Sequence, residues 1–241
     1  MRIRRKNFFR RVKMENFDYV KDNYLALKKE IAILAGQAGR EVTLVAVTKS
    51  GSDEELVALA DAGVSDIGEN RPGELHRRGE LLLSRGYSPT LHEIGNLQRN
   101  KVKLIIDRVE LIHSLDSLPL AEEIDKQAKK AGRRVKVLIE INSAREDQKG
   151  GVMPEDAEEF YLRIKDMEGI EVVGLMTMGP VCEDPEDMRP YFRETKELFD
   201  RLNRMPDFNG KILSMGMSDS YAVAIEEGAT LVRVGRKLFN R

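Results

Sequence analysis

The sequence predicts an α/β fold, a single (β/α)8 TIM-type barrel preceded by an extra N-terminal helix. Apolar runs of strand length alternate with helical patterns about eight times along the chain. Several of these runs are apolar at nearly every position, which is typical of parallel strands buried on both faces. The length of 241 residues suits one barrel with one core.

The first predicted element is an amphipathic helix that ends near Gly39 and Arg40. Its apolar positions recur at helical spacing: Val20, Tyr24, Leu27, Ile31 and Leu34. Eight strand candidates follow it. They cover residues 42–47, 66–68, 91–95, 111–115, 135–141, 172–178, 212–215 and 231–234. Spacing alone also allows an open doubly wound sheet, but no G-x-G-x-x-G follows the first strand, which argues against dinucleotide binding.

Helical patterns lie between the strand candidates. The best defined builds one apolar stripe from Met188, Tyr191, Phe192, Thr195, Leu198, Phe199 and Leu202. Ser52 and Glu55 form a predicted capping box at the start of the helix that follows the first strand. We therefore expect amphipathic helices packed around a buried parallel sheet.

Composition excludes several classes of protein. Charged residues make up 34% and hydrophobic ones 41%, the balance of a soluble globular protein, and no apolar run is long enough to span a bilayer. The single cysteine, Cys182, excludes an internal disulfide framework and suits a reducing, cytoplasmic location. The three histidines, His76, His92 and His113, are too scattered in sequence to indicate a metal site, so we predict no metal.

Residues 1–13 hold seven Lys or Arg and no acid. We expect them to form a solvated, disordered arm in front of a barrel domain at residues 14–241. A basic arm can also bind nucleic acid or an anionic surface, but it lacks the apolar core of a secretory signal. The acidic remainder of the chain argues against nucleic acid as the main partner. Because no apolar run could span a bilayer, we also expect no membrane partner.

Polar residues close most of the predicted strands. In a barrel the carboxyl ends of the strands carry function, although scattered polar loop residues are the simpler explanation for any one position. The set comprises Thr48, Lys49, Glu69, Asn70, His92, Gly95, Asn96, Asn142, Ser214, Gly216, Ser218, Asp219, Arg233, Gly235 and Arg236.

Lys49 is the most informative member, because it ends the run Val-Ala-Val-Thr-Lys. We expect it to enter the barrel mouth with a desolvated stem, which favours the neutral amine that attacks aldehydes. Lys49 then suits a Schiff base. The alternative is a lysine that extends past the strand end into solvent.

The last two strands end in loops typical of a phosphate site, because glycines there let backbone N–H groups approach an anion. These loops contain Ser214, Met215, Gly216, Ser218, Gly235 and Arg236. Ser218 could equally be an N-cap of the next helix. Arg233 lies within the last strand, facing either inward or outward. Facing inward beside a pyridine ring, it would leave the ring nitrogen unprotonated and weaken carbanion chemistry.

Together these segments resemble the family of pyridoxal 5′-phosphate (PLP) homeostasis proteins, related in fold to the barrel of alanine racemase. The resemblance spans nearly the whole chain from about Met14. It rests on residues 46–49, 68–70, 92–101, 141–150, 174–178, 213–218 and 232–235.

The resemblance implies that Lys49 carries PLP as a Schiff base and that Arg233 faces the pyridine nitrogen. It also implies that Asn70 lies near the ring, and that the phosphate is surrounded by Ser214, Ser218, Gly235 and the backbone at 236. Arg236 departs from the family's usual threonine, while Leu91 and Glu93 depart at the third strand. These departures affect phosphate affinity and pocket details rather than the fold.

Three functions are open at this point. The first is a PLP carrier or homeostasis protein that passes the cofactor to PLP-dependent apo-enzymes, acting as a monomer. The second is an amino-acid racemase, which needs acid-base groups on both faces of the ligand, with Tyr221 the one tyrosine to consider. The third is a barrel that binds another phosphorylated metabolite noncovalently, for which a Lys49→Ala variant would keep full affinity.

Overall fold

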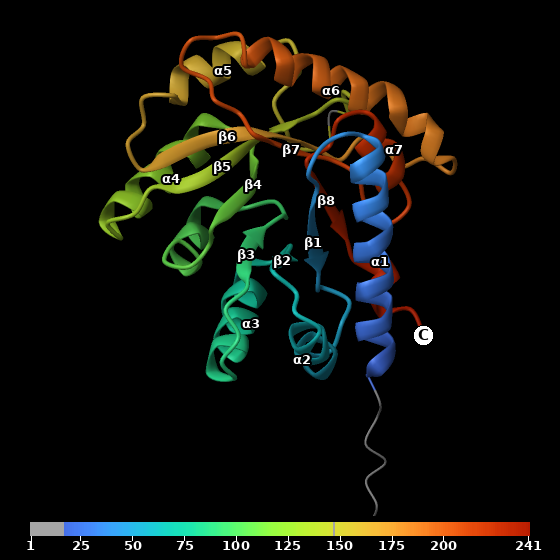
Figure 1. The fold of residues 1–241 in the computed structure, drawn as a ribbon. Helices are drawn as coiled ribbons and strands as arrows, with labels where there is room; N and C mark the ends of the chain where they lie inside the picture. The colour runs from blue at the N-terminus through green and yellow to red at the C-terminus, as the bar shows by residue number, and fades with distance from the viewer. Residues whose placement is uncertain (1–16, 147) are drawn as a thin grey trace, which may run out of the picture.

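The computed structural model describes residues 17–146 and 148–241 and forms a closed, eight-stranded parallel barrel (Figure 1). The strands pair in chain order, and β8 closes the ring by pairing with β1. Their bounds are β1 Thr43–Val47, β2 Asp66–Glu69, β3 Thr90–Glu93, β4 Leu111–Leu115, β5 Val135–Ile141, β6 Ile170–Thr177, β7 Ile212–Ser214 and β8 Leu231–Val234. All eight strand candidates and the predicted barrel are confirmed.

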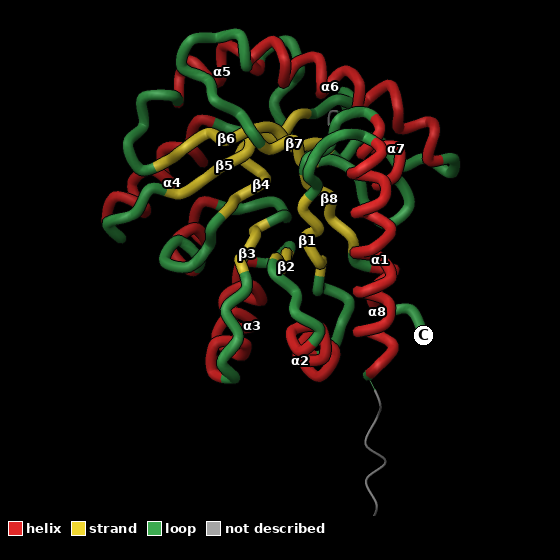
Figure 2. The backbone as a smooth tube through the Cα atoms, viewed as in Figure 1, coloured by secondary structure: helices red, strands yellow, loops and turns green. Residues whose placement is uncertain are grey.

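The helices lie outside the ring of strands (Figure 2). They are α1 Asp18–Gln37, α2 Asp53–Asp61, α3 Pro72–Ser84, α4 Leu118–Lys130, α5 Ala157–Ile164, α6 Arg189–Leu202, α7 Tyr221–Glu226 and α8 Arg236–Phe239, with 3-10 turns η1 Arg99–Leu104 and η2 Pro185–Met188. The predicted extra helix is α1, which packs against α8, α2 and α7. The predicted capping box is present at α2, where Ser52 and Glu55 bond each other's backbone N–H.

Two apolar layers hold the barrel. The larger lies between strands and helices and contains outward residues such as Ile67, Ile112 and Leu213. The smaller fills the barrel interior with Val45, Leu111, Leu138, Val173, Met176 and Leu231. Since side chains alternate along a strand, strands such as β4, β5 and β6 supply residues to both layers.

The register shifts by one residue between β5 and β6. Val137 pairs with Val172, whereas Leu138 pairs with Gly174. A Cβ at Gly174 would overlap the carbonyl oxygen of Ile212 on β7, and its φ is +156°. The glycine therefore permits a bulge at a point where two strands approach closely.

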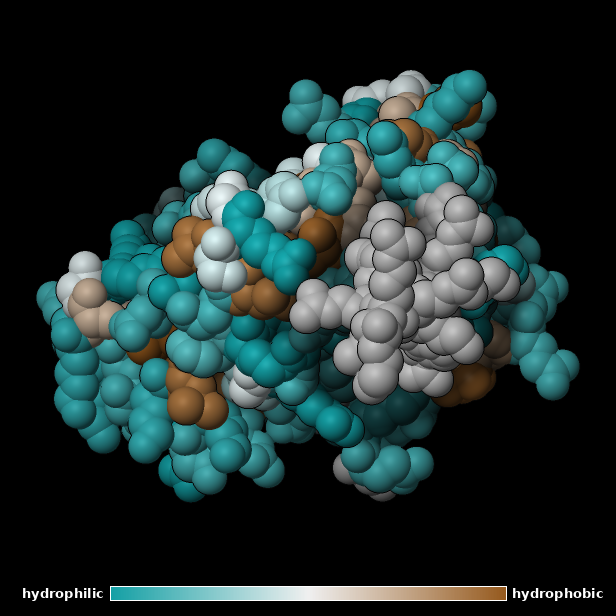
Figure 3. Space-filling view, turned by 90° about the horizontal axis from the view of Figure 1, so that it is seen from below, coloured by the Kyte–Doolittle hydropathy of each residue, from teal (hydrophilic) through white to brown (hydrophobic). Residues whose placement is uncertain are grey.

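The face in Figure 3 is mainly hydrophilic, with hydrophobic residues dispersed among charged ones. In the described part of the chain, no helix has the length and apolar character needed to cross a membrane. The predicted basic arm at 1–13 lies outside the described residues.

Candidate functional site

The predicted site residues come together because the barrel closes between β8 and β1. Ala46 pairs with Val234, so the segments that follow these strands are neighbours. A Cβ at Gly235 would lie 3.0 Å from the carbonyl oxygen of Val47, two residues before Lys49. The loop after β8 therefore lies directly beside the segment that carries Lys49.

Three buried side chains hold that segment from the outer side of the barrel. Thr48 Oγ1 donates to Glu69 Oε1 at 2.6 Å, and Arg78 of α3 donates to the same oxygen at 2.8 Å. Arg78 also donates to the carbonyl oxygens of Thr48 and Gly51, the latter at 2.7 Å. We call Thr48, Glu69 and Arg78 the outer clamp. Its bonds fix the backbone on both sides of Lys49.

Lys49 itself is exposed, although Thr48 before it is fully buried. The prediction of a desolvated Lys49 stem is therefore wrong. The chain turns immediately after β1, at residues 49–51, and this turn places Lys49 at the rim instead of along the strand. Its placement at the carboxyl end of β1 agrees with the prediction.

The loops after β7 and β8 also meet. Ser218 Oγ accepts a hydrogen bond from the Gly235 N–H at 3.4 Å, and Gly216 O accepts one from the Arg233 N–H at 3.1 Å. Gly216 has a φ of +92°, a conformation that favours glycine. Ser218 is not the cap of the following helix, because the N-cap is Ser220. The loops that carry Gly216, Ser218 and Gly235 are thus joined by hydrogen bonds.

Arg233 faces the barrel interior and is almost fully buried. Its guanidinium donates to Ser214 Oγ and, at 3.1 Å, to the carbonyl oxygen of Thr177. Burial lowers the pKa of Arg233 to about 10, which leaves it a cation at neutral pH. A buried fixed charge therefore lies one strand away from the Lys49 segment.

Behind Arg233 runs a row of hydrogen-bonded side chains through the barrel. His113 Nδ1 lies 3.0 Å from Ser214 Oγ, and His113 Nε2 lies 3.0 Å from His92 Nδ1. His92 Nε2 in turn lies 3.0 Å from Asp66 Oδ1. We call Asp66, His92, His113 and Ser214 the inner chain. The sequence argument considered the histidines only as metal ligands, and it did not predict the contact between His92 and His113.

Glu140 of β5 is a second group that the sequence argument missed. Burial raises its pKa to about 7; Asp116 adds to the rise and the Arg233 cation opposes it. The carboxyl and the guanidinium thus influence each other's charge inside the barrel. The sequence did contain a signal for this residue. Because side chains alternate along a strand, Glu140 faces the same side of β5 as Leu138, two residues before it.

Some predicted positions do not serve as expected. The Met215 side chain is buried in the layer under the helices, so only its backbone can face a ligand at the mouth. Arg236 is exposed and forms an ion pair with Asp219. Asn70 is half-buried, and Gly95 lies so close to its backbone that a Cβ there would overlap it.

Tyr221 is unsuited to the acid-base role considered for it. Its hydroxyl donates to Glu30 of α1 at 2.6 Å and accepts from Lys237 at 2.8 Å. The ring is buried, and burial together with the Glu30 carboxylate raises the pKa of the hydroxyl. Tyr221 joins α7 to α1, which agrees with the helix-packing alternative.

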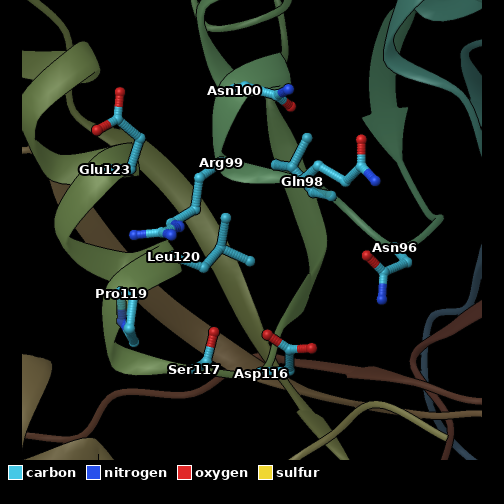
Figure 4. Close-up of a pocket in the computed structure, with 10 residues that line it drawn as sticks. Asn96, Gln98, Arg99, Asn100, Asp116, Ser117, Pro119, Leu120 and Glu123 are labelled. Atoms are coloured by element: carbon cyan, nitrogen blue, oxygen red, sulfur yellow. The ribbon is translucent and has the colours of Figure 1, made fainter.

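A cavity of about 860 Å³ lies beside the loops that follow β3 and β4 (Figure 4). Figure 4 shows Arg99 and Glu123 on one side of it and Asn96 on the other, with Asp116 and Ser117 at the end of β4. Of the residues lining it, only Asn96 belongs to the polar set named from the sequence.

Comparison with known sequences identifies the family. The family described as "Alanine racemase, N-terminal domain" matches residues 23–240. A pyridoxal phosphate homeostasis protein from Aquifex aeolicus is 43% identical over 205 residues, 85% of this chain and 89% of the relative. One from Helicobacter pylori (strain ATCC 700392 / 26695) is 36% identical over 218 residues, 89% of this chain and 95% of the relative.

Solved structures agree. PipY of Synechococcus elongatus with PLP bound is similar with a TM-score of 0.81 at 26% identity, covering 92% of this chain and 100% of PipY. An alanine racemase from Clostridium difficile has a TM-score of 0.74 at 18% identity, covering 93% and 56%, and supports the fold alone. This chain therefore belongs to the pyridoxal phosphate homeostasis proteins, which share the alanine racemase N-terminal domain.

Proposed function

We propose that this protein binds PLP as a reversible Schiff base on Lys49 and releases it to PLP-dependent apo-enzymes, as part of intracellular vitamin B6 and amino-acid homeostasis. The observation that carries the proposal is the meeting of three features at the β7–β8–β1 edge of the barrel. These are the exposed side chain of Lys49, the hydrogen-bonded loops that carry Ser218 and Gly235, and the buried cation of Arg233.

These features fit the chemical groups of PLP. When bound, PLP would supply an aldehyde, the group that forms a Schiff base with a primary amine. Lys49 presents the amine, and the outer clamp fixes the backbone from which it projects. Ser218 and Gly235 flank a surface where backbone N–H groups can bind a phosphate.

Arg233 favours binding and release of PLP over catalytic turnover. A guanidinium beside a pyridine nitrogen disfavours protonation of that nitrogen, because two neighbouring cations repel. The ring then withdraws electrons poorly, which suits holding and release better than turnover. The commitment of Tyr221 to Glu30 and Lys237 also favours a carrier over a racemase.

The test is covalent trapping. Purified protein is incubated with PLP, reduced with borohydride, and analysed by intact mass and peptide mapping. We expect one phosphopyridoxyl group, on Lys49, and its loss in Lys49→Ala. Lys103→Ala, an exposed lysine of η1, is the matched control and should keep the adduct.

An adduct spread over many surface lysines, or unchanged PLP affinity in Lys49→Ala, would refute the Schiff base and favour a noncovalent phosphate-binding barrel. The transfer step is tested separately, by mixing loaded protein with an excess of a PLP-dependent apo-enzyme and measuring how fast that enzyme regains activity. The control is the same apo-enzyme mixed with free PLP at the concentration that the loaded protein releases at equilibrium. If the enzyme regains activity no faster with the loaded protein than with this free PLP, the role is limited to storage.

A further inference from the structure

The inner chain crosses the barrel from one end to the other. Asp66 is the first residue of β2, and its side chain is 17% exposed at the amino end of the barrel. His92 and His113 follow on β3 and β4, both almost fully buried. The bond from His113 to Ser214 then spans the interior, because β4 and β7 are not neighbours in the sheet.

Each member of the inner chain has a limited set of hydrogen-bond donors and acceptors. The groups at its two ends therefore constrain which ring nitrogens of His92 and His113 carry a proton. Arg233 can only donate, so Ser214 Oγ accepts from it. At the other end, burial opposes ionisation of Asp66, but hydrogen bonds from His92 and Ser65 outweigh it and lower the pKa of the carboxyl. The ionised Asp66 carboxylate can only accept, so His92 Nε2 carries a proton.

The remaining protons follow in order. With His92 neutral, its Nδ1 is an acceptor, so His113 Nε2 carries a proton. Burial lowers the pKa of His113 well below its ordinary value, and the charge of Arg233 acts in the same direction. His113 is therefore neutral, its Nδ1 is an acceptor, and the Ser214 hydroxyl donates to it. Every donor in the chain then has an acceptor.

The opposite direction leaves a group unsatisfied. If His92 were doubly protonated, His113 would donate from Nδ1, and Ser214 Oγ would accept from both His113 and Arg233. The Ser214 hydroxyl proton would then need another acceptor. Among the described residues, His113 and Arg233 are the partners that the structure gives Ser214. A buried hydroxyl without an acceptor is costly.

We propose that Asp66, His92, His113 and Ser214 form a one-directional hydrogen-bond chain that positions Arg233, and that the Ser214 hydroxyl proton belongs to His113 rather than to a ligand. The positioning step deepens the proposed function and depends on PLP binding at this site. The direction of the chain does not depend on it. Ser214 then supports the ring-facing arginine and donates nothing to the phosphate, which revises the role implied by resemblance.

Histidine ring-nitrogen NMR tests the direction on the protein without PLP. The chain has three histidines, and the exposed His76 supplies the solvent-accessible reference. At pH 7 we expect His92 and His113 to be neutral, each protonated at Nε2. A proton on His113 Nδ1, or a doubly protonated His92, overturns the proposal.

A variant pair tests the positioning. His113→Phe keeps a ring but removes both nitrogens, and His76→Phe is the matched control on the surface of α3. We expect His113→Phe to bind PLP about tenfold more weakly, because one buried hydrogen bond to the arginine's partner is lost. The absorbance maximum of bound PLP should also shift, which a purely structural role would not cause.

Equal PLP affinity and spectrum in the two folded variants would overturn the positioning. If His113→Phe does not fold, the NMR result on the unchanged protein still decides the direction. If the wild-type protein forms no adduct on Lys49, the proposed function fails, while the ring-nitrogen measurement keeps its meaning.

Discussion

The outer clamp and the inner chain are both buried polar clusters that end at the barrel mouth, but they are built differently. The outer clamp places one guanidinium against a carboxylate and two backbone carbonyls, so each group has several partners. The inner chain is linear, and each link has one partner on either side. The comparison teaches that an ion pair fixes the backbone around Lys49, whereas a one-directional chain of hydrogen bonds positions Arg233.

The largest stability effect should come from breaking the outer clamp. Arg78→Leu leaves Glu69 buried without its cation, which should lower the free energy of unfolding by roughly 3–5 kcal/mol in urea denaturation. Adduct formation on Lys49 should also slow. Arg77→Leu, on the exposed face of the same helix, is the matched control and should cost at most about 1 kcal/mol. Similar losses in the two variants would contradict the clamp.

A second effect should appear at Glu93, the register neighbour of Glu69 on β3. Glu93 is fully buried, one carboxyl oxygen has no partner among the described residues, and burial raises its pKa to about 8. A raised carboxyl pKa contributes stability below about pH 4.5 that is lost as pH rises through about 8. Between about pH 5 and pH 8 the loss should be roughly 4 kcal/mol, at about 1.4 kcal/mol per pH unit.

Glu93→Gln should flatten this decline when the free energy of unfolding is measured from pH 5 to 9. The exposed Glu122→Gln on α4 serves as the matched control for the same substitution at the surface. An unchanged slope in Glu93→Gln would show that Glu93 is ionised in the folded protein.

The smallest effect should come from Ser52, at the far end of the segment that the clamp holds. Ser52→Ala removes the capping-box bond to the Glu55 N–H and should cost about 1 kcal/mol, measured as a shift of the urea midpoint. Trapping on Lys49 should keep its wild-type extent, because the bonds to Thr48 and Gly51 remain. Ser88→Ala, in an exposed loop, controls for the loss of a hydroxyl. A drop in trapping would extend the anchoring function to the α2 cap.

The fold could be predicted from the sequence because several strands, such as β1 and β5, are apolar runs, and the regular alternation of strand and helix patterns placed the shorter β2 and β3 between them. Lys49, Ser218 and Gly235 could be placed at the mouth because strand ends meet there in any parallel barrel. His92 and His113 could not be paired, because their contact depends on the register of β3 against β4. The bond from His113 to Ser214 crosses the interior and has no local sequence pattern.

Arg78 was missed for a different reason. It lies beside Arg77 on α3, and the spacing of the helix does not say which of two adjacent arginines turns inward. The burial of Lys49 was mispredicted because the run Val-Ala-Val-Thr-Lys does not show that the chain turns at Lys49, two residues after β1 ends. In both cases the deciding contact is tertiary.

Gly174 has a consequence for how alternation along β6 is counted. Both Val173 and Met176 belong to the interior layer although they are three residues apart, so the inward positions change parity at the bulge. If a side chain at position 174 removed the bulge, the residues after it in β6 that now face inward would face outward, and the outward ones would face inward. Met176 would leave the interior, and the Thr177 carbonyl would lose its position beside Arg233. Gly174 therefore determines which residues in the carboxyl half of β6 face the barrel interior and which face the helices.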